Sequence, residues 1–309
     1  MLFRSAAQSR DTIPQDSVRL LGGLTVSVAR PALTATGSSS VVIDLDSLGS
    51  PPAPSMAEVL CAMPLLQVRT NSRGEMQPAL RGSEDRQISI LVDGVPLTLG
   101  WDHRSDLSII PLTAARRVTL VRGLSSVLYG PNTLGGVVEV DLARVQQRVT
   151  SVDPAVFGVS LDATGSTQLS ATLGRLLDGR DGQWILRAGA GLSDRRGLPV
   201  PDGLADRADL RTRFLAEDDL RLNSDARRVD GFVTARYRSD NGGWASLSAS
   251  GYDVERGVPP EAHQDEPRLW RYPEQRRVLA AVSGGSGIRE TRWGSGDVEM
   301  SVGVDVGST

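Results

Sequence analysis

Cysteine is almost absent from this sequence, and histidine is nearly as rare. Cys61 is the single cysteine, and His103 and His263 are the two histidines. One thiol cannot form an intrachain disulfide or a thiolate metal cluster, and the two histidines stand far apart, outside any metal-ligand spacing. We therefore expect no metal site and no cofactor. Cys61 lies in the apolar stretch AEVLCAMPLL, which predicts a buried structural thiol.

Long hydrophobic runs and an excess of one charge are also missing. No apolar run approaches the roughly 18 residues of a membrane-spanning helix. The formal net charge is −3 over 309 residues, with the two signs interleaved, so there is no basic face for nucleic acid. The Gly-x-Gly-x-x-Gly and Walker spacings do not occur, and we find no catalytic constellation. A β-barrel stays open, because its strands need only about 10 alternating residues.

The N-terminal region has little apolar content. Its first residues, MLFRSAAQSRDTIPQD, lack the apolar core of a signal peptide, and residues 1–23 are predicted to be unstructured. Residues 24–30 begin with the β-prone segment LTVSV, and the linker TATGSSS follows. We expect a small mixed α/β domain at residues 38–148.

Short strands and one helix are predicted within this first domain. Ser55 and Glu58 have the spacing of a capping box, so a helix is expected to begin there and to end near Met63, before Pro64. A further helical turn is expected at residues 112–116. The predicted strands are residues 41–44, 65–69, 79–81, 88–92, 118–122 and 136–142.

The pattern changes to strict alternation after about residue 152. In residues 297–306, for example, valine and methionine alternate with polar or small residues, which places the two sets on opposite faces of a strand. About seven such strands are predicted within residues 153–309, at 155–163, 167–176, 183–192, 228–238, 243–253, 276–286 and 296–306. After the first connection, short links alternate with long ones, which is typical of an outer-membrane barrel. A soluble β-sandwich is the alternative, but it does not explain this alternation in length.

Four phrases in the first domain carry a resemblance. QPALRG, ISILVDGVPL, VTLVRG and LYGPNTLGGVVEVD occur in this order between residues 77 and 141, and they resemble the plug domain of TonB-dependent outer-membrane receptors. The resemblance implies an α/β plug domain, with a small mixed sheet and short helices, followed by the first strands of an antiparallel transmembrane β-barrel. Barrels that contain a plug have about 22 strands, so we expect an incomplete barrel and a chain that lacks its leader peptide.

The resemblance also implies roles for particular residues. The segment Leu24, Thr25, Val26, Ser27 and Val28 occupies the place of the TonB box, where a β-prone strand can pair with the edge of a partner sheet. Arg81 and Arg122 match two plug arginines that pair with carboxylates of the barrel wall, although both could instead be surface arginines beside turns. The residues expected to shape plug turns are Gly82, Asp93, Gly94, Gly123, Tyr129, Gly130, Gly135 and Gly136.

Energised import is the function that the resemblance implies. A scarce extracellular ligand, such as a ferric siderophore or a cobalamin-like molecule, would bind above the plug, and the energy-coupling protein TonB would act from the periplasm. The chain would lie in the outer membrane in contact with lipid. Candidate ligand contacts, all expected in loops, are Arg73, Trp101, Asp102, His103, Arg104, Arg256, His263, Trp270 and Arg271. A signalling receptor and a non-transporting adhesin or binding protein are the alternatives.

Overall fold

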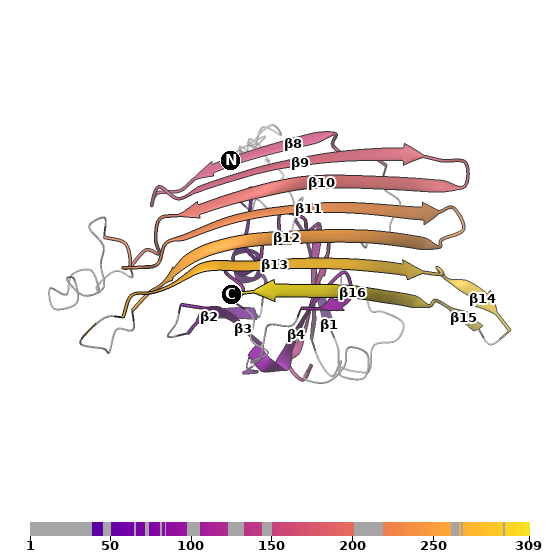
Figure 1. The fold of residues 1–309 in the computed structure, drawn as a ribbon. Coiled ribbons are helices and arrows are strands. Elements are labelled where there is room, and N and C mark those ends of the chain that lie inside the picture. The colour runs from indigo at the N-terminus through magenta and orange to yellow at the C-terminus, as the bar shows by residue number, and fades with distance from the viewer. Residues whose placement is uncertain are drawn as a thin grey trace, which may run out of the picture.

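The computed structural model describes most of the chain from residue 39 onward. The described residues are 39–45, 51–64, 66–71, 74–80, 82–83, 85–97, 106–122, 133–143, 150–200, 219–260, 266, 268–292 and 294–309. They form an N-terminal domain (residues 39–143) and a wall of seven long strands (residues 155–308), which lie against each other (Figure 1). None of the described helices has the length and hydrophobicity of a membrane-spanning helix.

The N-terminal domain is built around a five-stranded mixed sheet. Its order is β1-β6-β7-β4-β5, in which β4 and β7 are parallel and the other neighbours are antiparallel. The strands are β1 (Ser39–Asp44), β4 (Ile88–Val92), β5 (Val95–Pro96), β6 (Arg117–Arg122) and β7 (Gly136–Asp141). A hairpin, a short helix and a 3-10 turn complete the domain: β2 (Leu66–Thr70), β3 (Met76–Leu80), α1 (Met56–Cys61) and η2 (Asp85–Gln87).

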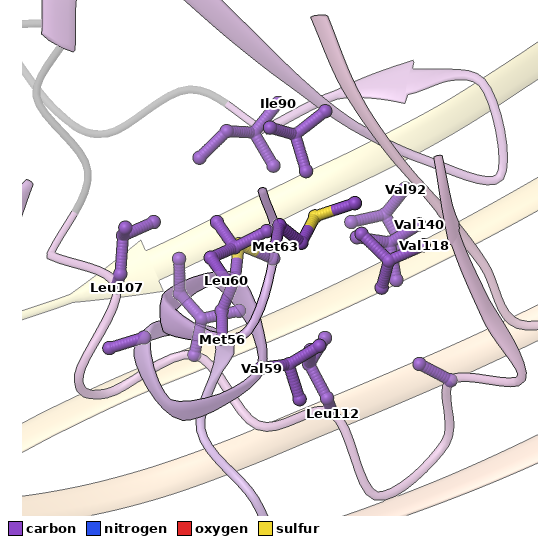
Figure 2. Packing of buried hydrophobic residues seen from close by; sticks show 14 of the residues in the cluster. Met56, Val59, Leu60, Met63, Ile90, Val92, Leu107, Leu112, Val118 and Val140 are labelled. Carbon is purple, nitrogen blue, oxygen red and sulfur yellow. The ribbon is translucent and has the colours of Figure 1, made fainter. Parts of the chain in front are cut away.

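Helix α1 packs its apolar side onto this sheet. Met56 and Leu60 are fully buried and belong to one apolar cluster with Val118 of β6 and Val140 of β7. Figure 2 shows part of this cluster, in which Met63 extends from the end of the helix towards Val92 and Val140. The predicted capping box is confirmed, because the Ser55 side chain accepts from the Glu58 amide while the Glu58 side chain accepts from the Ser55 amide. These two bonds satisfy amides that the first turn of a helix would otherwise leave unpaired.

Two predictions for this domain were wrong. Cys61 is exposed, because it is the last residue of α1 and lies off the stripe, spaced by three and four residues, that meets the core. The segment 112–116 contains no helix. Its one turn is closed by the Ala115 amide and the Leu112 carbonyl at 3.0 Å, while the Leu112 amide bonds to the Pro54 carbonyl. The six predicted strands are all present, with shifted ends.

The wall is one antiparallel sheet whose strands follow each other in chain order. Seven strands were predicted and seven are present, with β8 and β16 at the two edges. Their bounds are β8 (Ala155–Leu161), β9 (Thr167–Asp178), β10 (Gly182–Arg195), β11 (Ala226–Ser239), β12 (Trp244–Val258), β13 (Trp270–Gly285) and β16 (Glu299–Ser308). The sheet is open and extends as a curved array beside the N-terminal domain (Figure 1).

The two faces of the wall differ in chemistry. On β11, Val229 and Val233 point outward and are about half exposed. Asp230 and Thr234, which each follow one of these valines, point inward and are buried. The outward apolar set continues over the neighbouring strands, through Leu247, Val282 and Val302. A soluble sandwich would cover its apolar face with a second sheet. Here the polar face is the covered one, by the N-terminal domain, which argues against the sandwich alternative.

The connections have unequal lengths at the two ends of the wall. Residues 179–181 and 240–243 form short turns at one end, and the β10–β11 and β12–β13 connections at the other end are longer. The link after β13 was expected to be a short turn. It instead projects as a small hairpin, β14 (Arg289–Thr291) and β15 (Gly294–Gly296), at the short-turn end (Figure 1).

Candidate functional site: the interface between the N-terminal domain and the wall

Glycines on the inner face of the wall let the N-terminal domain come close. A Cβ atom added at Gly158 of β8 would lie 2.6 Å from the Pro52 side chain. At Gly191 of β10 it would lie 2.7 Å from Thr113 Oγ1, and at Gly303 of β16 it would lie 2.5 Å from Val95. Real Cβ atoms do not approach other atoms so closely. Any side chain at these positions would therefore push the domain off the wall.

Arginines of the wall bind main-chain carbonyls of the N-terminal domain. Arg228 of β11 is buried, and its Nη2 donates to the Ala53 carbonyl at 2.6 Å. Arg187 of β10 donates to the Ala114 carbonyl at 3.2 Å. Arg236, also on β11, donates to a third domain carbonyl near the end of β7. Guanidinium groups form stronger hydrogen bonds than neutral donors, so these contacts fix the domain against the wall.

A buried ion pair joins the two parts near the long-connection end of the wall. Arg256 Nη1 of β12 lies 2.6 Å from Asp106 Oδ2, and both side chains are less than a tenth exposed. Asp106 Oδ1 accepts from the Met76 and Ser108 amides, each at 3.0 Å. Arg256 Nε donates to Gln275 Oε1 at 3.0 Å. The carboxylate of the domain is thus connected to the guanidinium of the wall, and each has further hydrogen bonds of its own.

The predicted position of Arg256 was therefore wrong. It was expected in a long loop, exposed to a ligand, but it lies within β12 and is 3% exposed. Its guanidinium also lies 5.0 Å from the centre of the Tyr272 ring. The guanidinium is thus already engaged by Asp106, Gln275 and Tyr272.

Trp270 and Arg271 were also expected in that loop, and both lie at the start of β13. Trp270 is 64% exposed. Arg271 makes two bonds with Asp225, at 2.9 and 2.7 Å, and one with Glu255 at 3.2 Å. These hydrogen bonds from Arg271 hold the pKa of the Asp225 carboxyl below its usual value. Arg271 thus connects neighbouring strands, and its role in ligand binding stays a prediction.

The predicted turn residues fall into two groups. Asp93 and Gly94 have φ angles of 47° and 81°, and they form the two-residue turn between β4 and β5. Both central residues of such a type I′ turn need positive φ. Gly82 has a φ of 82°. Gly135 and Gly136 do not have positive φ. Gly136 is the first residue of β7, where a Cβ atom would lie 2.6 Å from the Val121 carbonyl oxygen, so close packing and not a turn requires glycine there.

Arg122 ends β6 and is partly buried. Its Nε atom has no hydrogen-bond partner among the described residues, and its pairing with a wall carboxylate stays a prediction. Other predicted site residues lie outside the described residues: Leu24, Thr25, Val26, Ser27, Val28, Arg73, Arg81, Trp101, Asp102, His103, Arg104, Gly123, Tyr129, Gly130 and His263.

A small, mainly apolar cavity lies between the N-terminal domain and the wall. Its volume is about 40 Å³, and its walls include Met56 and Leu112 on one side and Phe232, Leu279 and Asp230 on the other. This is space for water, since one water needs at least about 10–15 Å³ of such volume, and it is too small for an organic ligand. Among the described residues, no cluster of His, Cys, Asp and Glu side chains has the arrangement of a metal site.

The sequence did not reveal Arg187, Arg228 and Arg236 as interface residues. The one available signal was their position in the alternation, because each occupies an inward position of its strand. Their acceptors are main-chain carbonyls, which any residue supplies. No pairing pattern between the two halves of the sequence could therefore have predicted them.

Both the N-terminal domain and the wall resemble parts of known proteins. Residues 32–137 match the family model of the TonB-dependent Receptor Plug Domain. Over 100 residues the chain is 32% identical to the vitamin B12 transporter BtuB of Photobacterium profundum, a match that covers 32% of this chain and 16% of that relative. Over 117 residues it is 36% identical to the heme/hemopexin utilization protein C of Haemophilus influenzae, covering 38% and 16%. The chain thus matches about a sixth of the length of these curated relatives.

Solved structures extend the likeness to the wall. The copper transporter OprC superposes with a TM-score of 0.58 at 18% identity, covering 86% of this chain and 37% of that one. The ferric yersiniabactin uptake receptor FyuA of Yersinia pestis gives 0.55 at 18% identity, with coverage of 84% and 39%. At this identity the likeness shows a shared fold: an N-terminal domain against a wall of antiparallel strands.

Proposed function

We propose, on the premise that this chain carries the plug domain of a TonB-dependent receptor, that it acts in the energised import of a scarce ligand across the outer membrane. The observation that carries the proposal is the contact between the matched domain and the polar inner face of a wall whose apolar face is exposed. A domain that occupies the inside of a lipid-facing sheet controls passage along that sheet.

The outer face of the wall has the layout of a membrane-spanning surface. Towards the short-turn end, the Trp184 and Tyr237 rings lie with their centres 5.0 Å apart. Towards the long-connection end, charged pairs such as Arg276 with Asp253 occupy the same face. Between these limits the outward residues are apolar or small, with the exception of Arg175 on β9. An apolar band with aromatic residues at its border is typical of outer-membrane strands. The long connections would then face the outside of the cell.

Ligand recognition is assigned to the long-connection end. The relatives and structural neighbours include proteins named for vitamin B12, heme and a ferric siderophore, and all of these ligands are scarce and too large for simple pores. By analogy with these proteins, the proposed ligand is a ferric siderophore or a cobalamin-like molecule. In the sequence, the predicted contacts Trp101 to Arg104 precede Asp106 and the predicted contact His263 follows β12. Asp106 and the end of β12 both lie at the long-connection end.

Energy coupling is assigned to residues 24–28. A β-prone segment before the first strand of the domain can add to the edge of a sheet in TonB, and its affinity then rests on main-chain hydrogen bonds. Val26→Pro removes an amide donor from such a pairing, whereas Val26→Ala keeps it. We expect Val26→Pro to abolish binding of the purified periplasmic domain of TonB and Val26→Ala to weaken it only slightly, as measured by isothermal titration calorimetry on the full chain.

Equal binding by both variants would remove residues 24–28 from the coupling role. If the unsubstituted chain did not bind TonB at all, import would give way to a non-transporting adhesin or binding protein. A signalling receptor would still bind TonB, and it would differ in requiring an additional domain before the coupling segment.

A further inference from the structure

The peptide that leaves the N-terminal domain is held from two sides. Leu142 and Ala143 follow β7 directly, at the end of the domain, and both are about 5% exposed. Their backbone groups bond to a side chain of the domain and to a side chain of the wall. We refer to Leu142–Ala143 as the exit peptide.

Asp93 holds the amides of the exit peptide. Its Oδ1 accepts from the Leu142 amide at 2.8 Å and from the Ala143 amide at 3.2 Å. The Asp93 amide donates to the Val140 carbonyl at 2.9 Å. Its own carbonyl accepts from Ser283 Oγ of β13 at 2.9 Å. One residue of the β4–β5 turn is therefore bonded to the exit peptide, to the end of β7 and to the wall.

Arg236 holds the carbonyl of the exit peptide. Its Nη1 donates to the Ala143 oxygen at 3.2 Å, and its guanidinium lies 5.5 Å from the centre of the Trp244 ring. Among the described residues, Arg236 Nε and Nη2 have no hydrogen-bond partner, and neither has Asp93 Oδ2.

The turn itself does not require a carboxylate at position 93. A type I′ turn needs positive φ at both central residues, and Asn-Gly meets that need as well as Asp-Gly. What aspartate adds is a negative charge, here 1% exposed, and a buried charge is costly unless an opposite charge lies nearby. Arg236 supplies a positive charge that is bonded to the same peptide through the Ala143 carbonyl.

We propose that Asp93 and Arg236 are positioning residues that act together as an exit clamp, fixing the place where the chain passes from the N-terminal domain to the wall. Charge-assisted bonds hold the amides on one side and the carbonyl on the other. The exit clamp stands on these contacts alone and does not depend on the proposed function.

Under the proposed function, the exit clamp has a further role. A pull on residues 24–28 reaches β1 first, which is an edge strand of the order β1-β6-β7-β4-β5. Strand β7 is the middle strand of that order, and the turn at Asp93 joins β4 to β5 at the opposite edge of the sheet. The exit clamp would keep this side attached to the wall while β1 and its neighbours rearrange.

Hydrogen exchange of single amides tests the exit clamp on the full chain in detergent. Asp93→Asn keeps the turn and a neutral acceptor, so it isolates the charge. We expect exchange of the Leu142 and Ala143 amides to speed up by about tenfold, the effect of weakening a buried charge-assisted bond. Asp106→Asn is the matched control: it should speed up the Met76 and Ser108 amides instead. A turn residue without a clamp role would leave Leu142 and Ala143 unchanged.

Arg236→Gln tests the coupling. It should speed up the same two amides, and in the double variant with Asp93→Asn the two effects should be smaller than their product, because the charges act on each other. Independent effects of Asp93→Asn and Arg236→Gln, or no effect of Arg236→Gln on the exit peptide, would overturn the proposal. Unchanged exchange in β13 and β16 shows that each variant is folded. If Asp93→Asn is not folded by this criterion, the exchange of Leu142 and Ala143 in Arg236→Gln alone tests the proposal, because that substitution leaves the turn intact.

Discussion

The role of an arginine in this structure is decided by which face of the wall it occupies. Arg256 on the inner face is buried against Asp106, whereas Arg276 on the outer face pairs with Asp253 in solvent at 59% exposure. Removing one member of a buried pair leaves the other charge without compensation, and this is the costly case. Exposed pairs contribute little, because water screens them.

Arg256→Gln is therefore expected to destabilise the contact between the N-terminal domain and the wall by about 3–5 kcal/mol. The Asp106 carboxylate would remain buried without its guanidinium partner. Chemical denaturation of the full chain measures the loss, and Arg276→Gln is the control, with a denaturation midpoint close to that of the unsubstituted chain. Similar midpoints for the two variants would contradict a stabilising role for the buried pair.

At the scale of elements, the capping box determines where α1 begins. A six-residue helix has little stability of its own, so its position depends on the bonds between Ser55 and Glu58 and on the burial of Met56 and Leu60. The Ser55 amide donates to Glu58 Oε2 at 2.6 Å. Helix α1 contributes Met56, Val59 and Leu60 to the main apolar cluster of the domain, so a shift of the helix would disturb the core.

Ser55→Ala should lower the free energy of unfolding of the N-terminal domain by about 1 kcal/mol, the usual cost of losing a cap. Ser55→Asp, which can also accept from the Glu58 amide, should recover part of it. Thermal or denaturant unfolding followed by circular dichroism compares the two. A loss of the same size in both variants would mean that the hydroxyl acts by some means other than capping.

Alternation along the chain predicted all seven wall strands, but not their full length. β12 continues to Val258 and β13 begins at Trp270, beyond the predicted ends. In these extensions Glu255 and Arg271 point outward in place of apolar residues, so the sequence there looks like a loop. Pro273 also argues against a strand, because proline occurs in sheets mainly at edges and bulges. In the structure, Pro273 lies beside a register shift between Val254 and Arg256.

The interface could be predicted only in part. The polar inner face follows from the same alternation, and the Asp-Gly turn from its two residues. The partners of Arg187, Arg228 and Arg236 did not follow, because carbonyl acceptors leave no trace in the sequence. Ion pairs such as Asp106 with Arg256 join residues 150 positions apart in the chain. The sequence around either residue contains no feature that identifies its partner.

For the whole molecule, the exposed apolar face determines the environment that the wall requires. Val282 on β13 is 58% exposed within the apolar band, and Ile288 is 78% exposed beyond the end of that strand. In water such a continuous apolar surface promotes aggregation. In a lipid bilayer it is the favourable surface, and charge is what becomes costly.

An arginine at the two positions should therefore have different effects. Val282→Arg is expected to reduce membrane association, because an arginine on the lipid-facing side of a strand costs about 2–4 kcal/mol at the middle of the bilayer and less towards its borders. Ile288→Arg should leave association nearly unchanged. Flotation of the full chain with phospholipid vesicles measures both. Equal flotation of the two variants would count against the placement of this face in lipid.

The use of main-chain acceptors at the interface also affects how the two parts can diverge over evolution. Arg187, Arg228 and Arg236 bond to the carbonyls of three alanines, and any replacement that keeps the backbone path would present the same oxygen. Neutral drift in the N-terminal domain is thus tolerated at these contacts, while the arginines and the inner glycines are constrained. Chimeras that exchange N-terminal domains between distant homologues should dock correctly whenever the backbone path is preserved, even with little side-chain identity at the junction.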